Sequence, residues 1–204
     1  MEPYGASNPQ PVFGAFGLRI ISVTPLSEGR HVRLELEKKG KRIKVVKFST
    51  PYDEFPYKAG DTVNLAVKIT RNFYKEKSYL SIQAIDIHLS SVDEEKYFKE
   101  KNDYEHFMLT KNGISTLYPD RERCAVLYRF LKTEGGFKYN TDELYFRVQD
   151  KMNYAQLIFA LSAFKQAGLI DTESGMIKLL PADSKVNLQE TEILKTVRER
   201  LGIG

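Results

Sequence analysis

The sequence predicts a mixed fold, in which a small β-barrel precedes a helical domain. Over residues 15–91 apolar and polar side chains alternate, which is the period of strands with one buried face. From residue 92 onward the apolar side chains recur at helical spacing instead. With 204 residues and 42% hydrophobic content, the chain is long enough for two small domains.

Alternation in the first part of the chain is clearest at residues 30–37, where Val32, Leu34 and Leu36 share one face. The fourth strand follows the same rule, and its last apolar residue, Ile69, is also expected inside. The predicted strands span residues 18–24, 30–37, 42–48, 62–70 and 78–87.

Turns and breaks between these strands indicate how they connect. Polar turns at residues 38–41 and 75–77 predict two hairpins. Pro51 and Pro56 leave room for only a short helix between the third and fourth strands. Five strands with such an insert describe a five-stranded Greek-key barrel of the OB (oligonucleotide/oligosaccharide-binding) type. The alternative, an SH3-like barrel, would need shorter strands and a different place for the insert.

The second part of the chain is expected to be helical. Three helices followed by a small hairpin at residues 169–179 is the order of a winged-helix unit. We therefore predict a barrel at 15–91, a helical linker at 92–117 and a winged-helix-like domain at 118–204. The predicted helices span residues 94–108, 119–132, 140–150, 153–168 and 186–201.

Charge is distributed unevenly along the chain. Residues 1–92 hold 14 Lys or Arg against 9 Asp or Glu, whereas the rest holds 17 against 18. The basic excess of the first half indicates either a polyanion partner or a lysine-rich solvated surface. No apolar run is long enough for a membrane span.

The sequence contains no recognisable catalytic motif. Cys124, the one cysteine, excludes an internal disulfide and lies in an apolar helical pattern, so we expect a buried thiol in a reducing cytoplasm. His31, His88 and His106 lie far apart and have no acidic residues at metal-ligand spacing. We therefore expect no catalytic site, metal site or cofactor within this chain.

Residues 1–14 are unusually rich in turn-forming residues. Pro3, Pro9 and Pro11 each restrict the backbone, and Gly5 and Gly14 permit turns. Because terminal segments rarely specify turns so densely, we expect residues 1–14 to be a connector that follows a missing upstream core.

Several segments together resemble the RecJ family of bacterial single-strand-specific 5′→3′ exonucleases. Residues 3–13, PYGASNPQPVF, resemble the family segment P-[FY]-G-x-x-N-P-x-P-x-F. Residues 29–34, GRHVRL, resemble the strand G-x-H-[LV]-[KR]-L, and residues 45–48, VVKF, resemble the strand that follows. Asn72 with residues 79–87, YLSIQAIDI, resembles the family's last barrel strand. Beyond residue 91 the chain looks like the extra C-terminal domain of RecJ proteins from Gram-positive bacteria.

This resemblance implies that the chain is the C-terminal part of a DHH-superfamily nuclease used in DNA recombination and repair. The catalytic core, with divalent Mn²⁺ or Mg²⁺, would lie upstream, so the fragment alone should be inactive. The barrel would bind single-stranded DNA, and a single-strand-binding protein or a helicase would be a further partner. No membrane partner is expected.

The first group of candidate DNA-binding residues lies on the outward face of the second and third strands: Arg30, His31, Arg33 and Lys44. Cations contact phosphates and aromatic rings stack on bases in barrels of this type. Phe48 shares this face by alternation, but its apolar side chain favours a place in the barrel core. His31 has the alternative of a hydrogen-bonded strand-end residue.

A second group of candidates is expected in the loop between the fourth and fifth strands. Basic and aromatic residues are interleaved there, which is typical of a loop that contacts nucleic acid. The alternative is an ordinary exposed hairpin with its rings packed on the barrel rim. The candidates are Arg71, Asn72, Phe73, Tyr74, Lys75 and Tyr79.

Two further functions remain as alternatives. The helix predicted at residues 153–168 has Lys165 as its only basic residue, which argues against DNA reading and favours packing on a protein. The chain would then be an interaction scaffold that braces the nuclease core and docks a repair partner. An autonomous small nuclease is a weaker alternative, because the ligand cluster is missing.

Overall fold

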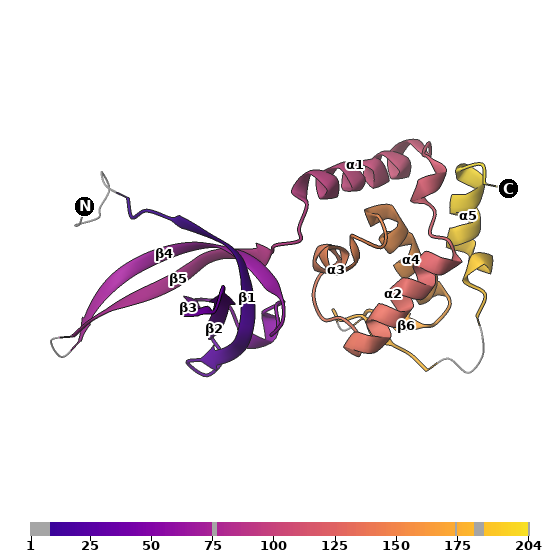
Figure 1. Cartoon of the computed structure of the whole chain (residues 1–204). Helices are drawn as coiled ribbons and strands as arrows, with labels where there is room; N and C mark the ends of the chain where they lie inside the picture. The colour runs from indigo at the N-terminus through magenta and orange to yellow at the C-terminus, as the bar shows by residue number, and fades with distance from the viewer. Residues whose placement is uncertain (1–8, 75–76, 174, 182–185, 204) are drawn as a thin grey trace. The chain divides into compact units, whose positions relative to one another are not determined.

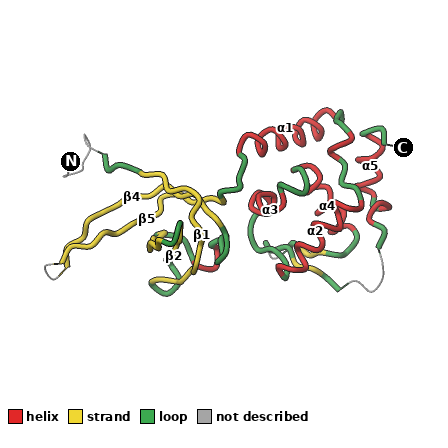
Figure 2. The backbone as a smooth tube through the Cα atoms, viewed as in Figure 1, coloured by secondary structure: helices red, strands yellow, loops and turns green. Residues whose placement is uncertain are grey.

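The computed structural model describes residues 9–74, 77–173, 175–181 and 186–203, and the chain divides into two compact units (Figure 1). The first unit, Met1–Val92, is built of strands, and the second, Asp93–Gly204, is mainly helical (Figure 2). The predicted order of a barrel followed by helices is confirmed. None of the described helices is both long and apolar enough to cross a membrane.

The first unit is a closed barrel with the strand order β1-β2-β3-β5-β4. Neighbouring strands are antiparallel except β3 and β5, which run parallel and pair at Val46 and Gln83. All five predicted strands are present, although β1, β4 and β5 are longer than expected. The strands are β1 (Phe13–Leu26), β2 (His31–Lys38), β3 (Lys41–Lys47), β4 (Thr62–Tyr74) and β5 (Lys77–Leu89).

The barrel interior follows the alternation in the sequence. Val32, Leu34 and Leu36 have no exposed surface. The segment between β3 and β4 forms only a short 3-10 helix (Tyr52–Glu54), and Tyr57 from this segment is buried. The hydroxyl of Tyr57 donates a hydrogen bond to the backbone oxygen of Ile87 at 3.0 Å, so this residue joins the segment to β5.

Two hairpins connect the long strands. The β2–β3 turn contains Lys39 and Gly40, which both have positive φ, 49° and 75°. Two such residues form the type I′ turn whose twist matches that of the flanking strands. In the other hairpin, β4 and β5 stay paired as far as Tyr74 and Lys77, so both strands extend away from the barrel (Figure 1). We call this extension, made of residues 68–74 and 77–83, the arm.

The arm corrects the expected loop between the fourth and fifth strands. Residues 71–74 belong to β4, and Lys75 lies outside the described residues. Ile69, which was expected inside, is only half-buried because it lies where the arm leaves the barrel.

The second unit contains five α-helices and a two-stranded sheet among its described residues. Three helices that follow residue 118 come before the two-stranded sheet, in the predicted order. The last helix is shorter than predicted, because a 3-10 turn (Leu188–Glu190) and the extended backbone of Thr191 come before it. The elements are α1 (Glu94–Thr110), α2 (Arg121–Glu134), α3 (Thr141–Val148), α4 (Tyr154–Gln166), β6 (Ile170–Asp171), β7 (Lys178–Leu179) and α5 (Glu192–Arg200), with a 3-10 helix at Ser115–Leu117.

Helix α1 packs on the other helices of the second unit, although its sequence predicts a helical linker. Tyr97 and Phe107 of α1 are buried in the core of this unit. The carboxylate of Glu100 accepts hydrogen bonds from the Tyr145 hydroxyl at 2.9 Å and the Tyr154 backbone N–H at 3.0 Å. These bonds join α1 to α3 and α4, and burial raises the pKa of the Tyr145 hydroxyl above its ordinary value.

Side chains cap the helices of the second unit at their N-termini. Asp120 and Asn140 accept hydrogen bonds from backbone N–H groups in the first turns of α2 and α3. Asn153 and Gln156 form a reciprocal capping box at α4. Each cap satisfies a backbone donor that the helix itself leaves unpaired, so these residues define where the helices begin.

Substitution of two adjacent glycines, Gly135 and Gly136, tests how closely the segment after α2 packs against the small sheet. A Cβ on Gly136 (φ 107°) would lie 2.6 Å from the backbone oxygen of Ile177, whereas one on Gly135 (φ 70°) would meet nothing within 4 Å. Gly135→Ala should cost about 1–2 kcal/mol, since it only places alanine in a left-handed conformation. Gly136→Ala should cost more, because it also disrupts the pairing of Phe137 with Ile177.

Thermal melting followed by the helical circular dichroism signal measures this difference. A lower melting temperature for Gly136→Ala than for Gly135→Ala is expected, and equal temperatures would contradict the close packing at Gly136.

Candidate nucleic-acid interface

A row of outward side chains crosses the barrel from β1 to β4. The strand registers place Arg33 opposite Val46 and Val46 opposite Gln83. Successive side chains of a strand point to opposite faces, so these residues share the outer face while Leu34 and Val45 point inside. We call this set the outer row: Thr24, Arg33, Val46, Gln83 and Lys68.

An aromatic pair lies beside the outer row. Phe48 follows β3 and its side chain is 44% exposed, so the predicted place in the core is wrong. Its ring packs against the His31 ring with centroids 5.1 Å apart and planes at 72°. Lys47, not Phe48, continues the inner face, and its ammonium donates a hydrogen bond to the backbone oxygen of Ile85. Strand alternation therefore outweighs the apolar character of Phe48.

Strained backbone is concentrated next to the aromatic pair. In the described part of the chain, five residues other than glycine have positive φ, and three of them are Ser27 (50°), Glu28 (60°) and Ser49 (52°). Ser27 and Glu28 form the turn just before β2, and Ser49 follows Phe48 directly. Each such residue costs on the order of 1–3 kcal/mol, and strain of this kind clusters at functional sites.

Cations accompany the aromatic pair on β2 and β3. Arg33 and Lys44 are both exposed. Glu35 faces Lys44 across the strands, and its carboxylate also lies 3.4 Å from the Arg42 guanidinium. Exposed ion pairs of this kind contribute little energy, so the cations can still attract phosphates.

Arg30 is placed differently from the other candidates of the first group. Its guanidinium Nε donates a hydrogen bond to the backbone oxygen of Ser27 at 3.1 Å. The side chain therefore folds back on the β1–β2 turn, where it remains exposed.

The arm separates the second group of candidates onto two faces. Asn72 is paired with Tyr79, which is 49% exposed, and alternation places both on the face of Gln83. Arg71 is paired with Leu80, which is 67% exposed, on the opposite face. The sequence did not reveal this division, because a loop has no alternation. The side chains of Phe73 and Tyr74, and Lys75 as a whole, lie outside the described residues.

The described residues do not fit a catalytic metal centre. Across the described ranges, no group of three or more His, Cys, Asp and Glu side chains could hold a metal ion. The ring Nδ1 of His31 is bonded to the Ser49 backbone N–H, and that of His88 lies 3.0 Å from the backbone oxygen of Leu89. We therefore derive no metal-dependent step from these residues.

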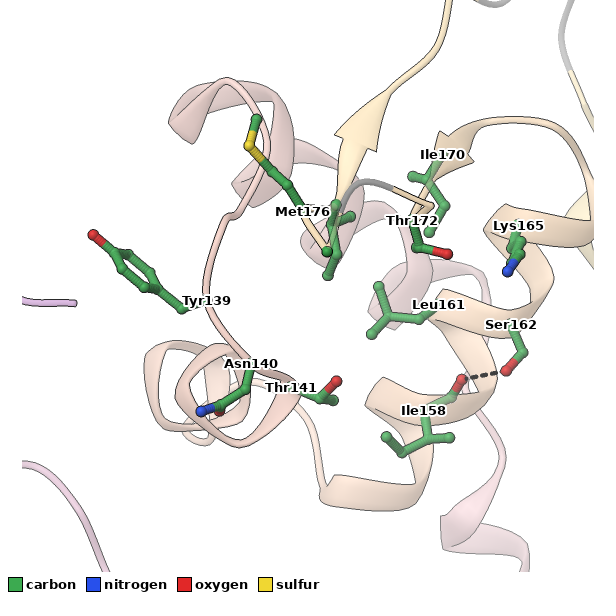
Figure 3. Close-up of a pocket in the computed structure, with 12 residues that line it drawn as sticks. Tyr139, Asn140, Thr141, Ile158, Leu161, Ser162, Lys165, Ile170, Thr172 and Met176 are labelled. Carbon is green, nitrogen blue, oxygen red and sulfur yellow. Dashed lines mark hydrogen bonds between the residues drawn. The ribbon is translucent and has the colours of Figure 1, made fainter. Parts of the chain in front are cut away.

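One pocket in the second unit has a volume of about 420 Å³ (Figure 3). Ile158 and Leu161 of α4 and Ile170 of β6 supply apolar walls, and Lys165 supplies a cation. Among the described residues that line it, none is Asp, Glu, His or Cys, and the Ser162 hydroxyl donates to the backbone oxygen of Ile158 at 2.9 Å. The described lining therefore places no His, Asp or Glu beside that hydroxyl to act as a general base.

The closed five-stranded barrel with its short insert defines an OB-type barrel, a class that binds oligonucleotides or oligosaccharides. The family model "RecJ OB domain" matches residues 1–86, and the model "Single-strand DNA-specific exonuclease, C terminal domain" matches residues 86–203. The chain therefore belongs to the family of RecJ-type single-strand DNA-specific exonucleases and contains the OB domain and the C-terminal domain of that family.

Several solved structures are similar to part of the chain. RecJ from Thermus thermophilus in complex with Mg²⁺ is 28% identical (TM-score 0.33), and the match covers 43% of this chain and 13% of that one. The single-stranded DNA-binding protein SSBb of Mycobacterium smegmatis is 16% identical (TM-score 0.32), with 38% and 84% covered. The second OB-fold domain of replication protein A from Methanococcus maripaludis is 15% identical (TM-score 0.30), with 44% and 96% covered. No curated protein matches the chain.

Cys124 provides a test for the absence of a reactive thiol. Its side chain is 1% exposed, and burial raises the pKa of the thiol to about 11. Because the thiolate is the reactive form, we expect iodoacetamide to modify the native chain far more slowly than the urea-unfolded chain at mildly alkaline pH. Mass spectrometry of timed samples measures both rates. Equal rates would show that Cys124 is accessible and reactive in the folded protein.

Proposed function

We propose that the barrel binds single-stranded DNA across the outer row and the adjoining face of the arm. The observation that supports this most directly is the exposed Phe48 ring, packed against the half-buried His31, beside Arg33 and Lys44 on an OB barrel of the RecJ family. Exposed rings stack on bases of any sequence, and cations bind the phosphates between them. Such a surface suits a nuclease that does not select its sequence.

The residues proposed to serve DNA binding, by direct contact or by support of a contact residue, are those that the sequence suggested, with Phe48 added. Phe48 and Tyr79 would stack on bases, while Arg33 and Lys44 would bind phosphates. Arg71 lies on the other face of the arm, so it would contact only a strand that passes around the arm. The full proposed set is Arg30, His31, Arg33, Lys44, Phe48, Arg71, Asn72, Phe73, Tyr74, Lys75 and Tyr79.

The whole protein is proposed to be a cytoplasmic exonuclease of DNA recombination and repair. Its catalytic core, outside this chain, would use Mg²⁺ or Mn²⁺ to hydrolyse single-stranded DNA from the 5′ end. The barrel would then capture substrate and support processivity, and this chain alone would not hydrolyse DNA. A single-strand-binding protein or a helicase would be its partner, and a Gram-positive source remains a prediction.

The second unit favours protein binding over DNA binding. We propose the barrel at 15–91 and a winged-helix-like domain at 118–204, with the helical linker of residues 92–117 packed into the core of the second unit through α1. Helix α4 has Lys165 as its only cation, and most of its side chains are buried in the core. This arrangement supports the second candidate function, a scaffold that braces the nuclease core and docks a repair protein.

Pull-down of a protein partner by the nuclease-treated chain would support this role, and binding of duplex DNA by the second unit would contradict it.

Titration with labelled oligonucleotides tests DNA binding directly. The chain should bind oligothymidylate more tightly than duplex DNA, because only unpaired bases can stack on exposed rings. Phe48→Ala should weaken single-strand binding by about 1–3 kcal/mol. Phe98→Ala is the matched control, since Phe98 is 59% exposed on α1 and packs against one neighbouring ring, that of Tyr97. Undetectable binding to both nucleic acids would refute the proposal.

Salt dependence tests the proposed phosphate contacts. Arg33→Gln and Lys44→Gln should each make the slope of log K against log salt concentration shallower by about 0.7, because fewer counterions are released. Lys99→Gln removes one exposed charge from α1 and should leave the slope unchanged. Fluorescence anisotropy at several salt concentrations gives these slopes. Parallel slopes for all variants would remove Arg33 and Lys44 from the interface.

A further inference from the structure

The ring of Phe48 packs against the ring of His31. His31 meets it edge-on, with centroids 5.1 Å apart and planes at 72°. This is a favoured geometry for aromatic pairs, because the positive ring edge faces the negative ring surface. Most of the His31 side chain is not free to contact a ligand, since the residue is half-buried.

The same His31 side chain also holds the backbone beyond Phe48. The backbone N–H of Ser49 donates a hydrogen bond to Nδ1 of His31 at 3.0 Å. Ser49 has a φ of 52°, a left-handed conformation that serine adopts at a cost of about 1–2 kcal/mol. Because Nδ1 accepts this bond, the neutral His31 ring carries its proton on Nε2. His31 therefore supports the turn that directs the chain away after Phe48.

Two further bonds hold this turn. The Thr50 hydroxyl donates to the backbone oxygen of Phe48 at 3.3 Å, and the Tyr52 backbone N–H donates to the oxygen of Gly29 at 2.8 Å. The bonds from Ser49 to His31 and from Tyr52 to Gly29 thus join residues 48–52 to the start of β2 and the turn before it. A ring held in this way loses little conformational freedom when it stacks on a base, which favours binding.

We propose that His31 is a positioning residue, which holds Phe48 and Ser49 so that the Phe48 ring is ready to stack on a nucleobase. This role rests on the proposed binding of single-stranded DNA, and it assigns to His31 no direct contact with the nucleic acid. Phe48 makes the stacking contact, and His31 affects the affinity for DNA only by holding the Phe48 ring in place.

Two conservative substitutions separate the contacts that His31 makes. His31→Asn keeps an acceptor near the position of Nδ1 but removes the ring. His31→Phe keeps a ring edge against Phe48 but removes the acceptor. Affinity for oligothymidylate should fall by about tenfold in Phe48→Ala and to a similar extent in His31→Ala. Each conservative variant should recover part of this loss, and His106→Ala, at an exposed histidine of α1, should bind as the unmodified chain does.

A double-mutant cycle decides between positioning and direct contact. If His31 acts through Phe48, adding His31→Ala to Phe48→Ala should cause little further loss of affinity. Fully additive losses, or unchanged affinity in His31→Ala, would overturn the positioning role and leave the proposed DNA binding intact. No binding by the unmodified chain would overturn both.

Hydrogen exchange of the Ser49 amide supplies a measurement without DNA. Exchange should be slow in the unmodified chain and in His31→Asn, and fast in His31→Phe and His31→Ala, with melting temperatures recorded for each. Equally slow exchange in all four would show that His31 does not hold the turn, which would overturn the inference.

Discussion

The candidate interface depends on the burial of one face of β2. Val32, Leu34 and Leu36 have no exposed surface, so Arg33 between them must point outward. A slip of one residue in register would move the apolar side chains into water and the cation into the core. Barrel closure extends this constraint from strand to strand through the paired registers, and so it sets every residue of the outer row.

Strain is tolerated near the outer row because the barrel surrounding it is firmly packed. Ser27 and Glu28 enter β2 through left-handed conformations, and Ser49 leaves Phe48 in the same way. Residues in such conformations persist only where the surrounding structure over-determines them. Here the turn after Phe48 is held by the backbone of Gly29, in the turn before β2, and by the ring of His31 at the start of β2. The free energy gained by burying the barrel core thus offsets the backbone strain at its surface.

The two units differ in how far their aromatic side chains are exposed. The barrel exposes aromatic rings and cations, whereas the second unit has nearly all of its aromatic residues buried in one core or packed against it. Glu100 joins α1 to α3 and α4 within that core, which makes α1 part of the unit. This contrast is consistent with a barrel that binds nucleic acid and a second unit that serves as a scaffold.

Strand and helix positions were largely determined by the sequence alone, because alternation, caps and turn residues act locally. The five strands, the β2–β3 turn and the caps Asp120, Asn140 and Asn153 illustrate this. Only the tertiary structure decided that Phe48 follows strand alternation outward and does not turn into the core, that Arg71 and Asn72 lie on opposite faces of the arm, and that α1 packs on the core. Each depends on partners distant in the sequence, since pairing with another strand or helix, and not local preference, determines which side of an element is buried.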